Sequence, residues 1–433
     1  MTTAETDWPR VSVVVLNMDG KRHLGPCFQS LMEMDYPADQ LEVILVDNGS
    51  RDRSVRYVQQ EFPQVRIIQN ERNEGFAGPN NQGAAAATGE YVAFLNNDMR
   101  VHPHWLRELV AAMRSAPDVA IVGGKILTWD GDAVDFGIGS INFYGMGFQP
   151  PDASPPPDQH AEVLFACGGS MLVRRQIFLE VGGFDPDYFA YFEDVDLGWR
   201  LWLLGYRVLY APRSLTYHRG HGTSSRMTTA QVGVLYERNA LYSIIKNYDE
   251  DHLQRVLPAA LLLLVRRALI FGRVDKRTFR MPRSDSSGPP PFQAGQSWMK
   301  DFAPQHDDPL YRRWLSFAEE YGVWSAIKAS IHVVLLWGYR LVGQLLRSQT
   351  LLMQRHAVSH LVAADDVVDS MPSLMDKRAL VQAQRKRSDA EILPLFRTPF
   401  HPHPPYEEYA AVQSMLSRIY GIDEMFAGSA QSS

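Results

Sequence analysis

Residues 43–50 have the sequence VILVDNGS, a run of apolar, mostly β-branched residues that ends abruptly in a polar turn. Such a run is typical of a strand that is buried on both faces of a sheet. Two similar runs, Val11–Leu16 and Tyr91–Leu95, precede and follow it in the chain. Because both faces of these strands need cover, we expect helices between them and a doubly wound, mostly parallel α/β sheet.

The segments between the apolar runs fit this expectation. They are amphipathic and predict four helices, over Arg22–Met34, Arg53–Phe62, Pro79–Ala87 and His104–Ser115. In an open α/β sheet, ligands bind beyond the carboxyl ends of the strands. The polar residues that directly follow each apolar run are therefore the first candidates for a functional site.

The chain as a whole has the composition of a globular enzyme. It has 433 residues, of which 45% are hydrophobic and 21% are charged, and its formal net charge is −6. This composition excludes wholesale disorder and argues against a nucleic-acid binder that relies on bulk positive charge. The two cysteines, Cys27 and Cys167, are too few for a disulfide framework or a zinc ligand set, so we expect a reducing, cytoplasmic compartment. No secretory signal is visible in the first ten residues.

The length of the chain predicts more than one folding unit. We expect an α/β domain over residues 1–250, with a proline-rich surface loop at 149–158, and a mainly helical region over 251–433. Within that region, Val256–Phe271 is apolar but too short and too basic for a membrane span, and Ile327–Leu346 also looks helical. Two interpretations of these helices stay open, packing against the α/β domain and association with a membrane surface.

Two polar clusters follow apolar runs. Asp47–Ser50 (DNGS) places a carboxylate at a strand end, where it can accept hydrogen bonds from a nucleotide base or a ribose hydroxyl. The alternative is a turn and helix cap. Asn96–Asp98 (NND) combines one carboxylate with two amides, a set that suits a hard divalent cation. Here the alternative is an ordinary polar turn at a strand end.

A loop rich in glycine and asparagine lies between these clusters, at Asn73–Gly83 (NEGFAGPNNQG). Glycine permits close approach of the backbone, and a helix N-terminus offers free N–H groups to an anion. Alternatively, the small residues serve to pack a helix on the sheet, which explains the alanines that follow but leaves the asparagines unexplained.

An acidic cluster appears later, where Gly182–Asp185 (GGFD) is followed by Phe192–Arg200 (FEDVDLGWR). Three carboxylates within four residues, beside aromatic side chains, favour a raised pKa and hence a useful proton acceptor. The alternative is the acidic first turn of a helix that begins at Glu193 and Asp194.

His218 follows a strand-like segment and could complete the coordination of a metal, although a lone histidine is usually structural.

In this order the motifs DNGS, RNEGFAGPNNQG, LNND, GGFD and FEDVDLGWR resemble glycosyltransferase family 2, the inverting enzymes with the GT-A nucleotide-sugar fold. The resemblance covers roughly residues 9–247 and is strongest to bacterial rhamnosyltransferase-like members that act on cell-surface polysaccharides. It implies transfer of a sugar from a nucleoside-diphosphate donor to a hydroxyl of a glycan or lipid-linked acceptor.

The resemblance also implies a role for each matching residue. Asp194 is the catalytic base with Glu193 beside it, and Asp98 binds Mg²⁺ or Mn²⁺ together with His218. The nucleotide-sugar donor is held by Asn17, Asp47, Asn73, Gly75, Asn96 and Asn97. In this chain Asn96 and Asn97 replace the acidic residues of the fuller metal motif, so Asp98 is the sole carboxylate there.

Two other functions are compatible with parts of the sequence. A non-catalytic scaffold that binds nucleotides or glycans is one, although the intact Glu193–Asp194 pair argues against it. A nucleotidyltransferase is the other, but it would have a glycine-rich, basic loop after its first strand, where this chain has NMDGKR with a single glycine. We expect a cytoplasmic protein with no nucleic-acid partner, and peripheral contact with the inner face of the membrane as an alternative.

Overall fold

The computed structural model describes residues 8–150, 159–220, 227–273 and 357–427. Met1–Ala268 and His356–Ser433 form one compact unit, and Leu269–Arg355 form a second, of which residues 269–273 are described. Most of the proline-rich loop and the predicted helix at 327–346 lie outside the described residues. The predicted boundary at residue 250 stays a prediction.

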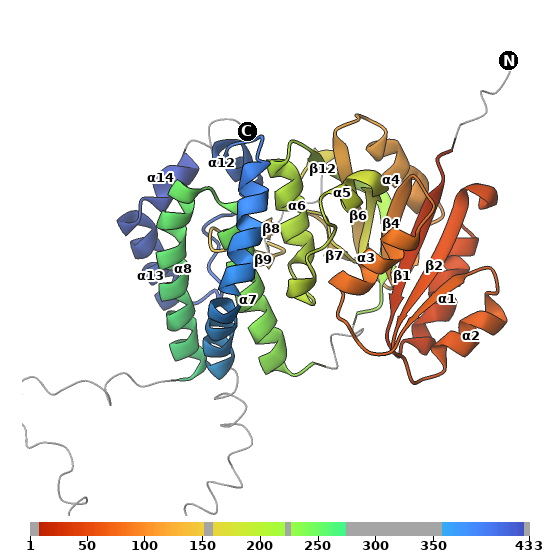
Figure 1. The fold of residues 1–433 in the computed structure, drawn as a ribbon, viewed down its shortest axis with the longest axis horizontal. Coiled ribbons are helices and arrows are strands. Elements are labelled where there is room, and N and C mark those ends of the chain that lie inside the picture. The colour runs from red at the N-terminus through yellow and green to blue at the C-terminus, as the bar shows by residue number, and fades with distance from the viewer. Residues whose placement is uncertain (1–7, 151–158, 221–226, 274–356, 428–433) are drawn as a thin grey trace, which may run out of the picture. The chain divides into compact units, whose positions relative to one another are not determined.

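A ten-stranded sheet forms the centre of the α/β part (Figure 1). Its strand order is β10–β12–β6–β11–β4–β1–β2–β3, with β5 paired to β12 and β7 paired to β6. The strands are β1 (Val11–Asn17), β2 (Leu41–Asn48), β3 (Arg66–Asn70), β4 (Tyr91–Asn96), β5 (Met99–Val101), β6 (Val119–Thr128), β7 (Val134–Phe136), β10 (Ala161–Glu162), β11 (Ser170–Arg174) and β12 (Arg207–His218). A separate two-stranded sheet consists of β8 (Ser140–Ile141) and β9 (Gly147–Phe148).

The strands of this sheet do not all run in the same direction. Strands β3, β2, β1 and β4 are parallel, as the three apolar runs predict, and β6 and β12 are parallel to each other. Between these groups, β11 runs antiparallel to both β4 and β6. The predicted α/β class with a helical C-terminal region is therefore confirmed, and the sheet is mixed.

Helices cover both faces of the parallel strands. The side chains of Val11, Val13 and Val15 share one core with α1 (Lys21–Met32), α2 (Ser54–Glu61) and α4 (Trp105–Met113). Val14 points to the opposite face, which is covered by α3 (Ala77–Ala86). This helix packs so closely that a Cβ atom on Gly83 would crowd the methyl groups of Val14 and Val46. Because successive residues of a strand alternate between faces, cover on both sides explains why the runs are continuously apolar.

The remaining helices come after β11 in the chain. They are α5 (Arg175–Glu180), α6 (Glu193–Leu203), α7 (Thr229–Asn247), α8 (Glu250–Phe271), a helix over 357–383, α12 (Asp389–Ile392), α13 (Glu407–Ile419) and α14 (Ile422–Ala427), with short 3₁₀ turns at Ala38–Gln40, Pro186–Tyr188 and Leu393–Phe396. Among the helices that the structure describes, none has the length and apolar character needed to cross a membrane.

Buried ion pairs join α7, α8 and the helix over 357–383, which run side by side (Figure 1). Arg267 of α8 donates to Glu237 of α7 at 2.6 Å, and His360 Nδ1 lies 3.0 Å from the same carboxylate. The Arg267 guanidinium lowers the pKa of Glu237 to about 2, although burial alone would raise it. Glu237 is therefore ionised, and its charge is compensated inside the helical region.

The chain after residue 393 returns to the small sheet. Ser140 donates to the carbonyl oxygen of Phe396 at 3.0 Å, and Asn142 donates to that of His401 at 3.2 Å. The ring of Phe148 stacks on His401 with the ring centroids 4.4 Å apart. The C-terminal region thus supports the strand that carries Phe148.

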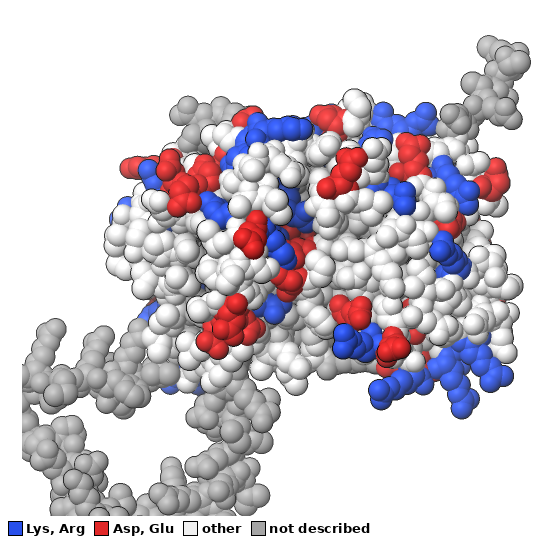
Figure 2. Space-filling model, viewed as in Figure 1, with Lys and Arg blue, Asp and Glu red and all other residues white. Residues whose placement is uncertain are grey.

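Charged side chains are interspersed on the face shown in Figure 2. Lysine, arginine, aspartate and glutamate alternate there over broad uncharged areas. This arrangement agrees with the small net charge of −6.

Two glycines of α3 provide a matched test of this packing. A Cβ atom on Gly83 would lie 2.5 Å from a methyl group of Val14, whereas one on Gly78 meets nothing within 4 Å. We expect Gly83→Ala to lower the free energy of unfolding in urea by about 1–3 kcal/mol, because the helix must move away from the sheet. Gly78→Ala should leave it unchanged or raise it by up to about 1 kcal/mol. Equal stabilities for the two variants would contradict the observed packing of α3.

Candidate active site

A cavity of about 960 Å³ lies at the polar ends of the central strands. Its lining includes residues from the strand ends, from the loop after β3 and from the start of α6. Eight of the ten predicted site residues share this lining, namely Asn73, Gly75, Asn96, Asn97, Asp98, Glu193, Asp194 and His218. Asp98 and His218, which are 120 positions apart in the sequence, therefore line the same cavity. The roles predicted for them stay predictions.

Asp98 and His218 are neighbours because β5 pairs with the end of β12. Asp98 lies in the turn before β5, and His218 is the last residue of β12, opposite Met99. His218 Nε2 is 3.3 Å from Asp98 Oδ2, and His218 Nδ1 is 2.7 Å from a carboxylate oxygen of Asp135.

The charges of this pair depend on each other. Burial alone would lower the pKa of His218, but hydrogen bonds to Asp98 and Asp135 raise it to about 9. Burial alone would raise the pKa of Asp98, yet the imidazole of His218 holds it below its usual value. The pair therefore presents an ionised carboxylate and an imidazole together at one end of the cavity.

Asn17 lies beside the cavity rather than on its lining. Its side chain is fully buried and donates to Asp47, Ser50 and Ser54, each at 3.0 Å. The side-chain oxygen Oδ1 of Asn17 accepts a hydrogen bond from the side-chain amide of Asn97 at 2.7 Å. Asn17 thus joins the ends of β1 and β2 to the turn after β4. The structure gives it a role in shaping the site, and direct contact of Asn17 or Asp47 with a nucleotide stays a prediction.

Asn48 is a lining residue that the sequence interpretation missed. Its side-chain amide donates to Asn73 at 2.8 Å and to the carbonyl oxygen of Gly75 at 2.9 Å. Strand alternation could have found it, because neighbouring residues of β2 point to opposite faces. Only one of Asp47 and Asn48 can therefore point toward the loop after β3.

Gly75 brings that loop against the segment before α6. Its φ is +82°, a left-handed conformation that favours glycine, and a Cβ atom there would collide with the carbonyl oxygen of Phe189. The same carbonyl accepts the backbone N–H of Phe76 at 2.5 Å. The loop after β3 and the segment before α6 are thus in direct contact.

The asparagines of the loop have structural partners. Asn81 exchanges two hydrogen bonds with the backbone of Phe184, at 2.7 Å and 2.9 Å, and so ties α3 to the GGFD motif. Asn80 donates to the carbonyl oxygen of Phe76 one turn earlier, at 2.9 Å. The motif therefore combines lining residues with residues that fix the loop.

The three carboxylates at the start of α6 have different environments. Asp196 is fully buried and lies 2.8 Å from the Arg200 guanidinium and 2.9 Å from the Lys246 ammonium group. These two cations lower the pKa of Asp196 against the effect of burial, so it is an ionised structural residue. Glu193 and Asp194 line the cavity instead.

Burial raises the pKa of Glu193 well above its usual value, and the nearby Asp194 raises it further. One oxygen of Glu193 has no hydrogen-bond partner among the described residues. Burial also raises the pKa of Asp194, but backbone N–H groups of Gly168 and Val195 donate to it at 2.9 Å and 2.8 Å and favour its ionised form. Burial therefore favours the uncharged form of Glu193, whereas the two backbone N–H groups favour Asp194 as the carboxylate that can accept a proton.

An aromatic segment leads into this pair. Phe189, Tyr191 and Phe192 have φ values of +62°, +69° and +65°, which are unfavourable for residues with a side chain. Each such residue costs on the order of 1 kcal/mol or more and persists only where its surroundings enforce it. All three line the cavity, and with them the wall includes Phe136, Phe148, Phe165 and Tyr236.

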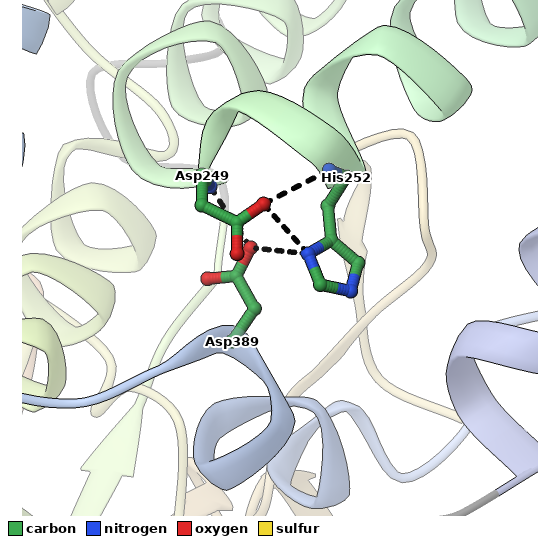
Figure 3. Close-up of side chains that lie close together, drawn as sticks. All are labelled: Asp249, His252 and Asp389. Atoms are coloured by element: carbon green, nitrogen blue, oxygen red, sulfur yellow. Dashed lines mark hydrogen bonds and ion pairs between the residues drawn. The ribbon is translucent and has the colours of Figure 1, made fainter.

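A second group of titratable residues lies away from the lining, at Asp249, His252 and Asp389 (Figure 3). His252 Nδ1 is 2.7 Å from Asp249 and 3.3 Å from Asp389. Asp389 also accepts the backbone N–H of Asp249 at 2.9 Å and a hydrogen bond from Arg385 at 2.8 Å. These bonds join the beginnings of α8 and α12, and we interpret the group as a clamp between helix ends.

Comparison with known proteins finds several that are similar to the α/β part. Residues 12–182 match the family described as Glycosyl transferase family 2. The O-antigen biosynthesis protein RfbC of Myxococcus xanthus is 33% identical over 237 residues, which cover 51% of this chain and 18% of that protein. The N-acetylglucosaminyl-diphospho-decaprenol L-rhamnosyltransferase of Mycobacterium tuberculosis is 27% identical over 42% of this chain and 68% of that protein. The chain thus spans less than a fifth of the length of the myxobacterial relative.

Among solved structures, the chain is similar to GalNAc-T7 in complex with UDP, GalNAc and Mn²⁺. The two are 18% identical with a TM-score of 0.49, over 59% of this chain and 52% of that chain.

The hydrogen-bond network around Asn17 predicts a large effect on stability. In Asn17→Ala, Asp47 and Asn97 lose their buried partner, so the free energy of unfolding should fall by roughly 3 kcal/mol. Gln60→Ala, at an exposed position of α2, is the control and should change it by less than about 0.5 kcal/mol. Urea denaturation measures both. A loss for Asn17→Ala no larger than that of the control would mean that the network does not stabilise the fold.

Proposed function

We propose, because residues 12–182 form a glycosyl transferase family 2 domain, that this protein is an inverting glycosyltransferase. It moves a sugar from a nucleoside-diphosphate donor to a hydroxyl group of a glycan or lipid-linked acceptor. One observation carries the proposal: Asp98 and Asp194 line the same cavity although they come from different elements. A sugar held between them would have its diphosphate on one side and a proton acceptor on the other.

The donor would lie along the polar wall. Asn48 and Asn73 are hydrogen-bonded to each other there, and Asn96, Asn97 and Asp98 follow at the end of β4. The amides offer both donors and acceptors to a ribose or a base. Asp47 and Asn17 would support this wall from behind, through the contact between Asn17 and Asn97.

Asp98 and His218 would hold a divalent cation. Their facing oxygen and nitrogen atoms lie 3.3 Å apart on the lining, and a carboxylate with an imidazole is a donor set that fits Mn²⁺ better than Mg²⁺. When bound, such an ion acts as a Lewis acid that stabilises negative charge on the oxygen of the departing diphosphate. As Asp98 is the only carboxylate of its motif, His218 would contribute the second ligand, and it would have to release to solvent the proton that Asp98 and Asp135 favour.

Asp194 would act as the general base. Its carboxylate accepts the proton of the acceptor hydroxyl while that oxygen bonds to the anomeric carbon, and the bond from this carbon to the diphosphate breaks. Attack from the side opposite the leaving group inverts the anomeric configuration in one displacement. Neutral Glu193 beside Asp194 adds no competing negative charge, and the N-terminus of α6 stabilises the ionised base.

The acceptor would contact the aromatic wall. Aromatic side chains offer flat apolar surfaces on which the C–H face of a sugar, or the apolar part of a lipid-linked acceptor, can lie. The name of the mycobacterial relative supports rhamnose as one candidate sugar and a lipid-linked glycan as one candidate acceptor. The cytoplasmic location, with peripheral contact at the inner face of the membrane, stays part of this proposal.

Replacement of the base tests the function directly. With Mn²⁺ and a panel of nucleotide sugars, the wild-type protein should release a nucleoside diphosphate from one donor. Asp194→Asn should lower that rate by about 10²–10⁴-fold, because general-base assistance is lost. Glu61→Gln, an exposed carboxylate at the end of α2, should retain the wild-type rate. A non-catalytic scaffold would bind nucleotides without releasing product, and an active Asp194→Asn variant would contradict the assignment of the base.

The pH profile provides a second measurement on the same residue. Turnover needs the ionised carboxylate, and burial raises the pKa of Asp194 above its usual 3.8. The rate should therefore fall as the pH decreases through a value higher than that of an ordinary aspartate. An acidic limb at the ordinary value would mean that another group controls the rate.

Replacement of the carboxylate at the other side of the cavity tests donor binding. Titration calorimetry with UDP, GDP and dTDP should show that Mn²⁺ strengthens the binding of one of them to the wild-type protein. In Asp98→Asn this enhancement should fall by about tenfold or more, because an amide is a weak ligand for the ion. The variant keeps the size of the side chain, so the fold should persist. An enhancement equal to that of the wild type would show that the ion binds elsewhere.

A further inference from the structure

The aromatic segment before α6 has a backbone that its own sequence does not favour. Phe189 combines φ +62° with ψ −62°, and the N–H of Ala190 donates back to the carbonyl oxygen of Tyr188 at 2.7 Å, which forms a tight γ-turn. That turn is rare and strained for a residue with a side chain. Tyr191 and Phe192 are both left-handed as well. Some group outside the segment must hold it in place.

Asn239 of α7 is that group. Its side chain is fully buried, and its amide nitrogen donates to three carbonyl oxygens of the segment. The distances are 3.0 Å to Tyr188, 2.8 Å to Ala190 and 2.7 Å to Tyr191. The two N–H groups of this amide therefore donate to three carbonyl oxygens, which the strained turn brings close together.

The orientation of this amide is also fixed. Arg238 Nε donates to the side-chain oxygen Oδ1 of Asn239 at 3.1 Å, which turns the NH₂ group of the same amide toward the segment. A second nitrogen of Arg238 donates to the carbonyl oxygens of Asp187 and Tyr188 at 3.0 Å and 3.1 Å. Ser243, one turn later on α7, bonds to the Tyr188 hydroxyl at 3.0 Å and to the Asn239 carbonyl oxygen at 2.9 Å. One face of α7 thus encloses the start of the segment.

The segment that Asn239 holds contacts both sides of the cavity. The carbonyl oxygen of Phe189 accepts the N–H of Phe76 in the loop after β3, at 2.5 Å. Phe192 directly precedes Glu193 and accepts the N–H of Asp196 at 2.9 Å, in the first turn of α6. A change in this backbone would therefore displace Asp194 and the aromatic wall together.

We propose that Asn239 is a positioning residue for the transfer reaction, which holds the segment 188–192 in its left-handed conformation and thereby fixes Asp194 against the acceptor. This inference rests on the proposed function for its catalytic consequence, but the structural step stands independently of it. Asn239 is not itself a lining residue of the cavity, although it binds the backbone of Ala190 and Tyr191, which are. Its effect reaches the chemistry only through the backbone that it binds.

Asn239→Asp is the decisive variant, because it keeps the shape of the side chain but removes both N–H donors. Hydrogen exchange on the full chain should show that the amides of residues 187–192 exchange about tenfold faster or more, while the central strands stay protected. Ile245→Val, a small change at a buried position of the same helix, is the control and should not produce this local increase. Unchanged exchange at 187–192, or an increase spread over the whole protein, would overturn the proposal.

A double substitution tests whether strain is the quantity that Asn239 controls. Glycine adopts positive φ without penalty, so Tyr191→Gly relieves part of the demand on Asn239. We expect Asn239→Asp to reduce stability less in the Tyr191→Gly background than in the wild type, as measured by urea denaturation. Strictly additive losses would mean that Asn239 satisfies buried carbonyl groups without holding the conformation.

Kinetics separates this role from a general loss of structure. In Asn239→Asp, turnover should fall about tenfold or more, because a misplaced base loses its alignment. The affinity for UDP, GDP or dTDP with Mn²⁺ should stay unchanged, since those ligands contact the opposite wall. Equal losses in turnover and nucleotide affinity would contradict a positioning role. If the wild-type protein transfers no sugar, the proposed function fails, and the exchange measurement still decides the role of Asn239.

Discussion

The site depends on one buried cation, the ammonium group of Lys246. It is 2.6 Å from Asp185 of the GGFD motif and 2.9 Å from Asp196 of α6, and all three side chains are buried. Without this cation Asp196 would keep only Arg200 and Asp185 only Lys377, and the two buried carboxylates would lose the positive charge that lies between them, which is destabilising. Residues two apart on a helix point in nearly opposite directions. Because Lys246 and Arg200 hold Asp196 on one side of α6, Asp194 must face the cavity on the other.

The helical C-terminal region completes the same arrangement. Lys377, from the helix over 357–383, binds Asp185 and Asp187 at 2.5 Å each, and Arg378 donates to the carbonyl oxygens of Ile245 and Tyr248 at 2.7 Å and 2.5 Å. These contacts fasten the helix to the end of α7, the helix that carries Lys246 and Asn239. A segment more than 100 residues later in the chain thus restrains the start of α6. The helices after residue 356 are part of the support of the site, whatever further partner they have.

The sequence predicted those helices and strands that are indicated by the pattern of neighbouring residues. The predicted helix Arg53–Phe62 corresponds to α2 (Ser54–Glu61), and the helix expected to begin at Glu193 does begin there. The direction of β11 could not be predicted, because a strand buried on both faces has the same apolar pattern in either direction. Eight of the ten site residues predicted from the motifs line the cavity. They did not predict the supporting role of Asn17 or the contacts of Asn239, since their partners lie 30 and about 50 positions away and no spacing rule records such contacts.

The two walls of the cavity are therefore built on different physical principles. The polar wall consists of strand ends, whose positions follow from the pairing of β1, β2 and β4 and from hydrogen bonds among short side chains. The aromatic wall includes a strained segment, whose backbone carbonyl groups are bound by Asn239 of α7. Because contacts from outside the segment hold its backbone, its aromatic side chains can be substituted while the backbone conformation is kept, provided that Asn239 is retained. Under the proposed function this separation would allow the aromatic wall to vary while the polar wall is kept, since the two walls are joined at the contact between Phe76 and Phe189 and at the start of α6.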